Sequence, residues 1–309
     1  MLGPFWSAYS GSPKWLKTLI RKNAWILRAV LKPFVSSVRI GGFVMHLDLG
    51  DNASLRYLGW AEESDDRLRA IFLRLIAGSP DCTVIDVGAS YGLFALSAAA
   101  LAKAGAIRAI VAVEPDARCI GALARSMSAN GFTGYMRSVH GIAGDRNGEA
   151  NLYVSANAST SNRSFDSRDD GALFSLQEVR TVPAVRLDDE VSRERQSEPF
   201  RVVIKIDVEG SEARVLRGLS QTLTDAASCG LIFEYYPTGM RAVQQSREEL
   251  FNALSGHRWT ECWVEDHSEL RPFASQELLW SYLHDYYDRF VGTSAAPDVI
   301  LLRGLSLTS

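Results

Sequence analysis

The sequence predicts an α/β protein built on a doubly wound, mostly parallel β-sheet. Short apolar runs rich in β-branched residues, such as TVIDV at 83–87 and IRAIVAVEP at 107–115, alternate with segments of helical periodicity. Strands that are almost continuously apolar are typical of parallel sheets covered by helices on both faces. A glycine-rich turn follows the first run, at the strand-to-helix junction where such sheets hold their ligands.

The predicted elements alternate regularly along the chain. An alanine-rich helix follows the 83–87 strand and extends to about residue 103. After the second strand comes a helix at 117–130, which Asn130-Gly131 ends. The remaining expected strands cover 135–143, 178–191 with Pro183 at an edge, 200–210, 229–237, 257–265 and 298–304, and the remaining helices cover 244–255 and 278–290.

Residues 144–170 interrupt this alternation with a polar stretch rich in Asn, Ser, Asp and Gly. Its first part alternates and predicts a hairpin, and a loop follows. Two interpretations of the loop stay open. It is either a mobile or substrate-facing segment or a plain surface insertion.

The N-terminal 60 residues differ in charge from the rest. Residues 1–47 hold seven Lys or Arg and no acidic residue, and residues 14–32 have a helical apolar rhythm that ends at Pro33. This helix either covers the body of the protein or lies on an anionic membrane or lipid-linked substrate. A short hairpin is expected at 38–49 and a helix at 62–77. We predict a basic amphipathic extension over 1–60 and one α/β domain over 61–309.

Composition excludes several classes of protein. With 47% hydrophobic and 22% charged residues and a net charge of −3, the chain suits a globular protein and not one that binds nucleic acid over its whole surface. The four cysteines form no CxxC pair, which argues against a zinc site or a disulfide framework. No apolar run is long enough to span a bilayer. A cytoplasmic protein is expected, with peripheral membrane contact through 14–32 as an option, and its oligomeric state stays open.

Two motifs predict a nucleoside-containing cofactor. The turn Asp86-Val87-Gly88-Ala89-Ser90-Tyr91-Gly92 supplies glycines where a cofactor backbone must approach, and Asp86 could receive an ammonium group. Glu114 ends the next strand and could accept hydrogen bonds from two ribose hydroxyls. NAD shares this second requirement, so an NAD-dependent oxidoreductase stays an alternative. The missing middle glycine, Ser90 here, weakens it, because pyrophosphate needs that close approach.

A third motif, IKIDVEGSE at 204–212, places acidic residues at the end of another strand. Asp207 and Glu209 could accept a proton, hold substrate hydroxyls or bind a metal. Glu209 and Glu212 also suit the positive end of a helix dipole. Glu234, at the end of the fifth strand, could join them. His140 is expected to be a core histidine. A cluster of late aromatic residues could line an acceptor pocket, although core packing is the commoner use.

The ordered motifs IDVGASYG, VEP, IKIDVEGSEARVLRG and IFEYYP, over residues 83–237, resemble the FkbM family of S-adenosylmethionine-dependent methyltransferases. The resemblance implies a Rossmann-like class I methyltransferase fold over 61–309, S-adenosylmethionine as cofactor, and O-methylation of a small-molecule or glycan hydroxyl on a sugar, glycolipid or secondary metabolite. A catalytically silent scaffold in glycan assembly is a second alternative. The usual asparagine of the glycine turn is Ser90 here.

The resemblance also assigns site residues. It implies that the cofactor lies against Asp86, Gly88, Ala89, Gly92 and Glu114, and that Ala143 and Asp145 contact its adenine. It implies that Asp207 and Glu209 lie near the transferred methyl group, with Asp207 the first choice as proton acceptor. No residue is assigned to a metal.

Overall fold

The computed structural model describes residues 36–40, 42–58, 63–102, 105, 107–155, 159, 162–164, 176–194, 199–266 and 269–308. The helix expected at 14–32 lies outside the described residues, and so does its predicted membrane contact. Among the helices that are described, none has both the length and the apolar character needed to cross a membrane.

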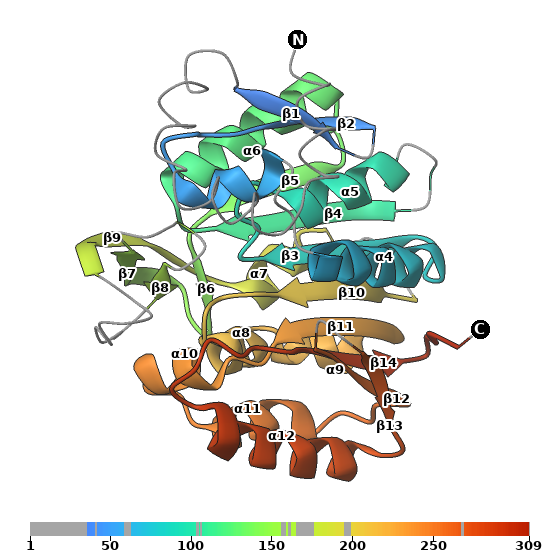
Figure 1. Ribbon diagram of the computed structural model, residues 1–309. Helices are drawn as coiled ribbons and strands as arrows, with labels where there is room; N and C mark the ends of the chain where they lie inside the picture. The colour runs from blue at the N-terminus through green and yellow to red at the C-terminus, as the bar shows by residue number, and fades with distance from the viewer. Residues whose placement is uncertain are drawn as a thin grey trace, which may run out of the picture.

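An eight-stranded sheet forms the centre of the molecule (Figure 1). Its strand order is β13-β12-β14-β11-β10-β3-β4-β5, and the five strands from β11 to β5 are parallel. The predicted α/β architecture with a mostly parallel sheet is therefore confirmed. The strands are β3 (Cys82–Val87), β4 (Ile107–Glu114), β5 (Met136–His140), β10 (Arg201–Ile206), β11 (Ser228–Glu234), β12 (Glu261–Glu265), β13 (Leu270–Phe273) and β14 (Asp298–Arg303).

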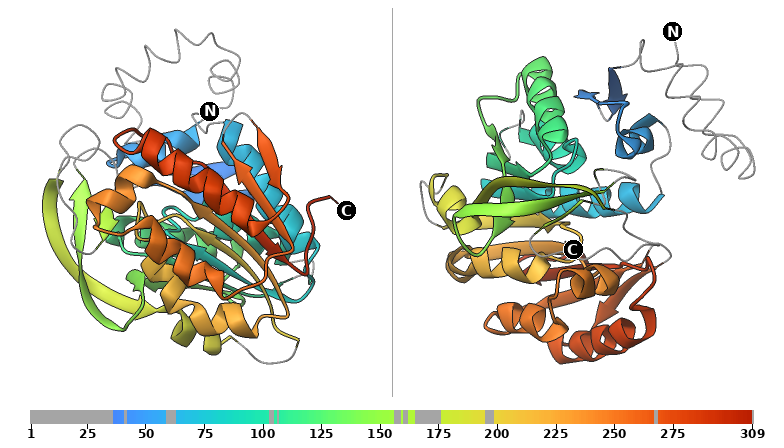
Figure 2. Two further views of the ribbon diagram at one scale, coloured as in Figure 1. Left: turned by 90° about the horizontal axis from the view of Figure 1, so that it is seen from below. Right: turned by 90° about the vertical axis from the view of Figure 1, so that its left-hand side faces the viewer.

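Helices cover both faces of this sheet because successive strand residues point to opposite sides. Val84 packs into one apolar cluster while its neighbour Ile85 packs into the other, and Val203 and Ile204 divide in the same way. The first cluster is completed by α4 (Glu63–Ala77), α5 (Leu93–Ala102) and α6 (Ala117–Asn130). The second is completed by α7 (Leu187–Ser192), α8 (Glu212–Gly218), α9 (Ser220–Asp225), α10 (Pro237–Ala242), α11 (Arg247–Ser255) and α12 (Gln276–Phe290). Figure 2 shows α12 on the outer side of its layer.

The segment 36–58 packs into the first cluster. The predicted hairpin is present as β1 (Ser37–Ile40) and β2 (Phe43–His46), and a 3-10 helix, η1 (Asn52–Leu58), follows. Phe43 and Met45 are fully buried among residues of α5 and α6. The side chain of Asn130 accepts a hydrogen bond from the backbone N–H of Val44 at 2.9 Å and donates one to its carbonyl at 2.6 Å. These residues therefore share the core of the α/β body.

A second, four-stranded sheet corrects two predictions. The expected single strand at 135–143 is partly wrong: β5 covers Met136–His140 as expected, but the chain continues as β6 (Ile142–Gly144) in the other sheet. Gly141 lies between them, where a Cβ would be 2.8 Å from the carbonyl oxygen of Pro183. The order of this sheet is β6-β9-β7-β8, with β7 (Gly148–Ser155), β8 (Arg163–Ser164) and β9 (Leu176–Arg186).

The strand expected at 178–191 is also partly wrong. Strand β9 ends at Arg186, and α7 begins at the next residue. The reason is tertiary: Leu187 and Val191 are one helical turn apart and both are buried in the second cluster. Pro183 pairs with Glu149 of β7 on one side, and on the other side it lies just before the pairing with β6, which begins at Ala184, so its missing N–H interrupts none of the described pairs between β9 and β6.

Candidate active site

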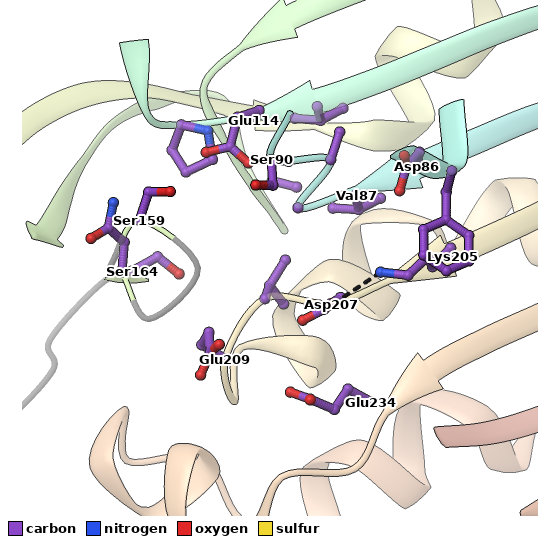
Figure 3. Close-up of a pocket in the computed structure, with 18 of the residues that line it drawn as sticks. Asp86, Val87, Ser90, Glu114, Ser159, Ser164, Lys205, Asp207, Glu209 and Glu234 are labelled. Atoms are coloured by element: carbon purple, nitrogen blue, oxygen red, sulfur yellow. Dashed lines mark hydrogen bonds and ion pairs between the residues drawn. The ribbon is translucent and has the colours of Figure 1, made fainter. Parts of the chain in front are cut away.

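A cavity of about 310 Å³ lies at the carboxyl ends of the parallel strands (Figure 3). Strand β3 contributes Asp86, β4 contributes Glu114, β11 contributes Glu234, and the end of β10 contributes Lys205 and Asp207. These side chains converge because parallel strands end at one edge of the sheet, which is where open α/β sheets bind ligands.

The glycine turn after β3 forms one wall of this cavity. Gly88 and Ala89 line it, and their N–H groups donate to the carbonyl of Val113 at 2.9 and 3.0 Å. The two glycines are needed for packing within the protein, and not only for a cofactor. Gly88 has φ +77°, and a Cβ there would lie 1.8 Å from the carbonyl oxygen of Asp207. Gly92 has φ +89°, and a Cβ there would lie 2.3 Å from the side chain of Leu123. Gly92 does not line the cavity.

Asp86 is 1% exposed, and only one of its two carboxylate oxygens accepts a hydrogen bond from the described residues. Its Oδ2 accepts a hydrogen bond from the backbone N–H of Ala95, in the first turn of α5, at 3.0 Å. Its Oδ1 is buried and has no hydrogen-bond partner among the residues that the structure describes. Burial raises the pKa of Asp86 to about 6, and the nearby charge of Lys205 opposes that rise. A buried oxygen without a partner at the cavity wall suits a ligand that brings an ammonium group.

Glu114 anchors the turn from the neighbouring strand. One carboxylate oxygen accepts the N–H of Ser90 and the other accepts the N–H of Asp116, both at 2.8 Å. Ser90 adopts φ +50°, a conformation that is rare for a side chain other than glycine. Burial raises the pKa of Glu114 to about 8. Each oxygen of a carboxylate has a second acceptor site, so Glu114 can still receive two hydroxyl groups.

Of the two residues expected near adenine, the structure places one at the cavity and the other away from it. Ala143 lines the cavity from β6, together with Ile142 and Gly141. Asp145 does not line it, because the chain turns away after β6. The Asp145 carboxylate accepts a hydrogen bond from Arg217 Nε at 3.3 Å on α8 instead.

The opposite end of the cavity is acidic. Asp207, Glu209 and Glu234 each offer a carboxylate oxygen, and these oxygens lie within 4.8 Å of one another. Burial first, and then the charges of Asp207 and Glu209, raise the pKa of Glu234 well above its usual value. Carboxylates at this spacing are acceptors for substrate hydroxyls, and they are also the ligands that hard divalent cations use.

A buried glutamate builds the turn that carries Asp207 and Glu209. Glu212 Oε1 accepts the N–H groups of Val208 at 3.1 Å and Gly210 at 3.2 Å. Gly210 has φ +104°, and a Cβ there would meet the backbone of Gly239 at 2.2 Å. Glu212 therefore shapes the site as well as standing at the start of α8.

Lys205 is a residue that our sequence analysis did not assign. It is 5% exposed, and its Nζ lies 3.0 Å from Asp207 Oδ2 and 4.7 Å from the centroid of the Phe94 ring. It is the only cationic side chain among the described residues that line the cavity. Burial lowers its pKa, but the charges of Asp207 and Asp86 outweigh burial, so the net shift is upward. A lysine inside an otherwise apolar strand was the available signal.

Part of the polar stretch at 144–170 does face the cavity. Ser159, Asn162 and Ser164 line it, which agrees with a substrate-facing segment for these described residues. The Ser164 hydroxyl shares a hydrogen bond with the hydroxyl of Ser211 at 2.9 Å. Ser211 lies at the N-terminus of α8 but does not cap that helix with its side chain.

The late aromatic residues do not line the cavity. Phe251 stacks on Trp280 with ring centroids 4.8 Å apart, and Tyr286 lies 4.3 Å from Phe290 in the same layer. They serve core packing in the second cluster. The expectation that His140 is buried is wrong, since it is exposed and its Nε2 lies 3.0 Å from the carbonyl oxygen of Pro115.

Several solved structures resemble this chain weakly. An FkbM methyltransferase from Methylobacillus flagellatus KT has a TM-score of 0.37 and 14% identity, with 72% of this chain and 43% of that one covered. TYW2 from M. jannaschii, in complex with AdoMet, has a TM-score of 0.40 and 10% identity, with 86% of this chain and 83% of that one covered. An O-methyltransferase from Bacillus cereus, in complex with SAH, has a TM-score of 0.39 and 8% identity, with 77% of this chain and 81% of that one covered.

The chain thus spans less than half of the FkbM methyltransferase from M. flagellatus. Among curated protein sequences, none matches it. The model of the methyltransferase FkbM domain matches residues 86–276, which is more than half of the chain and includes all three sequence motifs. The chain therefore belongs to the FkbM family of methyltransferases, whose cofactor is S-adenosylmethionine.

Proposed function

We propose that the protein transfers the methyl group of S-adenosylmethionine to a hydroxyl oxygen of a sugar, glycolipid or secondary metabolite. One observation carries this proposal. A single cavity has an end that suits an amino acid joined to a ribonucleoside and another end lined by carboxylates. The family match argues against the NAD-dependent alternative.

The cofactor end is assigned by complementary groups. The unpartnered Oδ1 of Asp86 would receive the ammonium group, and Glu114 would receive the two ribose hydroxyls. The backbone at Gly88 and Ala89 would run beside the ligand, and Ala143 would contact the adenine. The sulfonium of the bound cofactor supplies a methyl group that is already activated, so the protein's task is alignment of the nucleophile.

The acceptor end supplies a base. A hydroxyl oxygen forms its new bond to carbon as the bond from carbon to sulfur breaks, and the hydroxyl proton must leave at the same stage. Asp207 is our first choice to accept that proton, and Glu209 is the second. Lys205 holds Oδ2 of Asp207, which leaves Oδ1 to face the hydroxyl. The products are a methyl ether and S-adenosylhomocysteine.

The first test is titration calorimetry with S-adenosylmethionine, S-adenosylhomocysteine and NAD. We expect binding of the two sulfur ligands in the micromolar range, roughly −8 kcal/mol, and none of NAD. Glu114→Ala should weaken that binding at least about tenfold, through the loss of both ribose hydrogen bonds. Glu149→Ala, at an exposed glutamate on β7, is the matched control. A folded protein that binds neither sulfur ligand would overturn the proposal and favour a silent scaffold.

The second test concerns the acceptor. Purified protein with isotopically labelled S-adenosylmethionine is offered a panel of glycosides, glycolipid extracts and hydroxylated metabolites, and methylated products are identified by mass spectrometry. Asp207→Asn should lower product formation about 10²-fold or more, the usual contribution of a general base, while ligand affinity stays within about threefold, below 1 kcal/mol. Methylation of nitrogen or carbon instead of oxygen would contradict the proposed reaction.

A further inference from the structure

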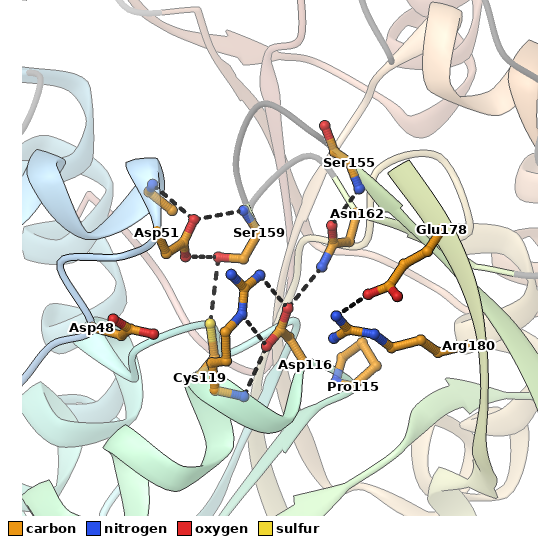
Figure 4. Close-up of polar contacts among 12 residues, drawn as sticks. Asp48, Asp51, Pro115, Asp116, Cys119, Ser155, Ser159, Asn162, Glu178 and Arg180 are labelled. Carbon is orange, nitrogen blue, oxygen red and sulfur yellow. Dashed lines mark hydrogen bonds and ion pairs between the residues drawn. The ribbon is translucent and has the colours of Figure 1, made fainter. Parts of the chain in front are cut away.

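Asp51 is a buried carboxylate that connects three separate parts of the chain. It lies just before η1 and is 3% exposed. Its Oδ1 accepts the N–H of Ser159 at 3.0 Å and of Ala53 at 3.2 Å. Its Oδ2 accepts the hydroxyl of Ser159 (Figure 4). The same oxygen accepts the hydroxyl of Tyr91 at 3.0 Å. Both oxygens are therefore shared between segments that lie far apart in the sequence.

One of these partners lines the cavity, and another belongs to the glycine turn that forms its wall. Ser159 lines the cavity, and Tyr91 lies in the glycine turn directly after Ser90, whose N–H is held by Glu114. The ring of Tyr91 also meets the ring of Tyr57, with centroids 6.0 Å apart, and Tyr57 lines the cavity as well. Asp51 and Tyr57 both precede residue 86, where the match to the family domain begins.

A second set of contacts holds the same wall. Asn162 Nδ2 donates to Asp116 Oδ2 at 3.1 Å (Figure 4). The N–H of Asp116 in turn donates to Glu114 at 2.8 Å. The wall formed by Ser159 and Asn162 is thus tied to the cofactor turn from one side by Asp51 and from the other by Asp116. Such contacts fix the distance between the two walls that a bound cofactor would touch.

We propose that Asp51 is a positioning residue of the cofactor pocket, which holds the Ser159 wall against the glycine turn from outside the family domain. This inference rests on the proposed function, because the ligand that it concerns is S-adenosylmethionine. It makes residues 43–58 a working part of the pocket, where the sequence alone predicts a separate extension.

The test measures the affinity for S-adenosylhomocysteine by titration calorimetry, which needs no knowledge of the acceptor. Asp51→Asn removes the negative charge, so the four hydrogen bonds lose their charge-assisted strength, and the amide nitrogen can keep the two hydroxyls only if both turn from donating to accepting. We expect affinity to fall about tenfold, equivalent to about 1.4 kcal/mol. Asp48→Asn is the matched control, because its carboxylate accepts only the nearby N–H of Gly50 among the contacts described and should leave affinity unchanged.

Two measures distinguish a positioning role of Asp51 from a purely structural one: titration at a temperature where every variant is folded, and a double-mutant cycle. Titrations are run at about 10 °C, where circular dichroism shows each variant to be folded. Tyr91→Phe removes the hydroxyl contacts to Asp51 and to the Asp48 carbonyl, and Ser159→Ala removes those to Asp51 and Cys119 Sγ. Both variants serve if Asp51→Asn does not fold. Asp51→Asn combined with Tyr91→Phe should lose no more affinity than Asp51→Asn alone, since both changes act on one network.

The outcomes are distinct. If wild type binds S-adenosylhomocysteine and the variants bind it equally well while melting earlier, Asp51 is structural only and this inference is wrong. If the losses are fully additive, the two residues act separately and the shared network is wrong. If folded wild type binds neither sulfur ligand, the proposed function fails and takes this inference with it.

Discussion

Gly88→Ala would place a methyl group where the structure has no room for one. The added Cβ would lie 1.8 Å from the carbonyl oxygen of Asp207 and 2.9 Å from its carbonyl carbon. These are backbone atoms of the adjacent strand end, which is held to β3 by the hydrogen bond from Asp207 N–H to the Val87 carbonyl at 3.0 Å. The two strand ends must separate before the methyl group fits.

The expected cost has two parts that can be measured apart. A left-handed conformation costs an alanine about 1–2 kcal/mol, and overpacking adds about 1–3 kcal/mol. Gly131→Ala is the matched control, because Gly131 has nearly the same φ, +70° against +77°, and nothing within 4 Å of its would-be Cβ. Gly131→Ala should therefore lose about 1–2 kcal/mol in free energy of unfolding, and Gly88→Ala about 2–5 kcal/mol.

Urea denaturation, followed by circular dichroism, measures both losses. Gly92→Ala should fall between them, because its Cβ would meet the mobile end of the Leu123 side chain and not a backbone. Equal losses at Gly88 and Gly131 would refute the reasoning, since the strand ends would then yield without strain. Gly88→Ala should also impair methyl transfer, because Asp207 moves with its carbonyl.

Three further predictions concern charge and packing. Asp86 and Glu114 have pKa values raised to about 6 and about 8, so the fold favours their neutral forms. The stability that they contribute is present at low pH and lost as pH rises through those values, and the melting temperature without ligand should be lower at about pH 8.5 than at about pH 5.5. Glu114→Gln should reduce this difference, and an unchanged pH dependence would contradict the assignment. Lys205→Met removes the cation that lowers the pKa of Asp86. Calorimetry should therefore show weaker binding of S-adenosylmethionine at about pH 7 and a recovery of affinity near pH 9. Equal losses of affinity at both pH values would contradict this role of Lys205. Phe251→Ala should lower the free energy of unfolding by about 3 kcal/mol and leave the affinity for S-adenosylhomocysteine unchanged. A large loss of affinity would contradict the conclusion that the late aromatic residues serve core packing only.

Local pattern was a good guide where a segment is buried on both faces. The strands at 83–87, 107–115 and 229–237 are within two or three residues of β3, β4 and β11, because continuous burial leaves a continuous apolar run. The local pattern was misleading where one apolar segment contributes strands to two different sheets. Residues 135–143 look like a single strand, yet Gly141 lets the chain leave one sheet and enter another.

The site shows the same division. Asp86, Glu114 and Asp207 could be placed from the sequence because each follows an apolar run, and parallel strands end at one edge. Asp145 has the same kind of sequence setting, but the turn after β6 carries it to Arg217. Lys205 was missed because a lone lysine carries no periodic signal, and its value depends on two carboxylates that only the fold brings near.

The sequence by itself determined the family, the parallel core and the residues at the ends of its strands. These depend on local composition and on motifs whose spacing is short. Only the tertiary structure decided which distant segments meet where no motif links them: Asp51 with Tyr91 and Ser159, and Arg217 with Asp145. Such contacts depend on how two sheets and the N-terminal hairpin pack together, and that packing is set by the fit of the whole core, which no single segment encodes.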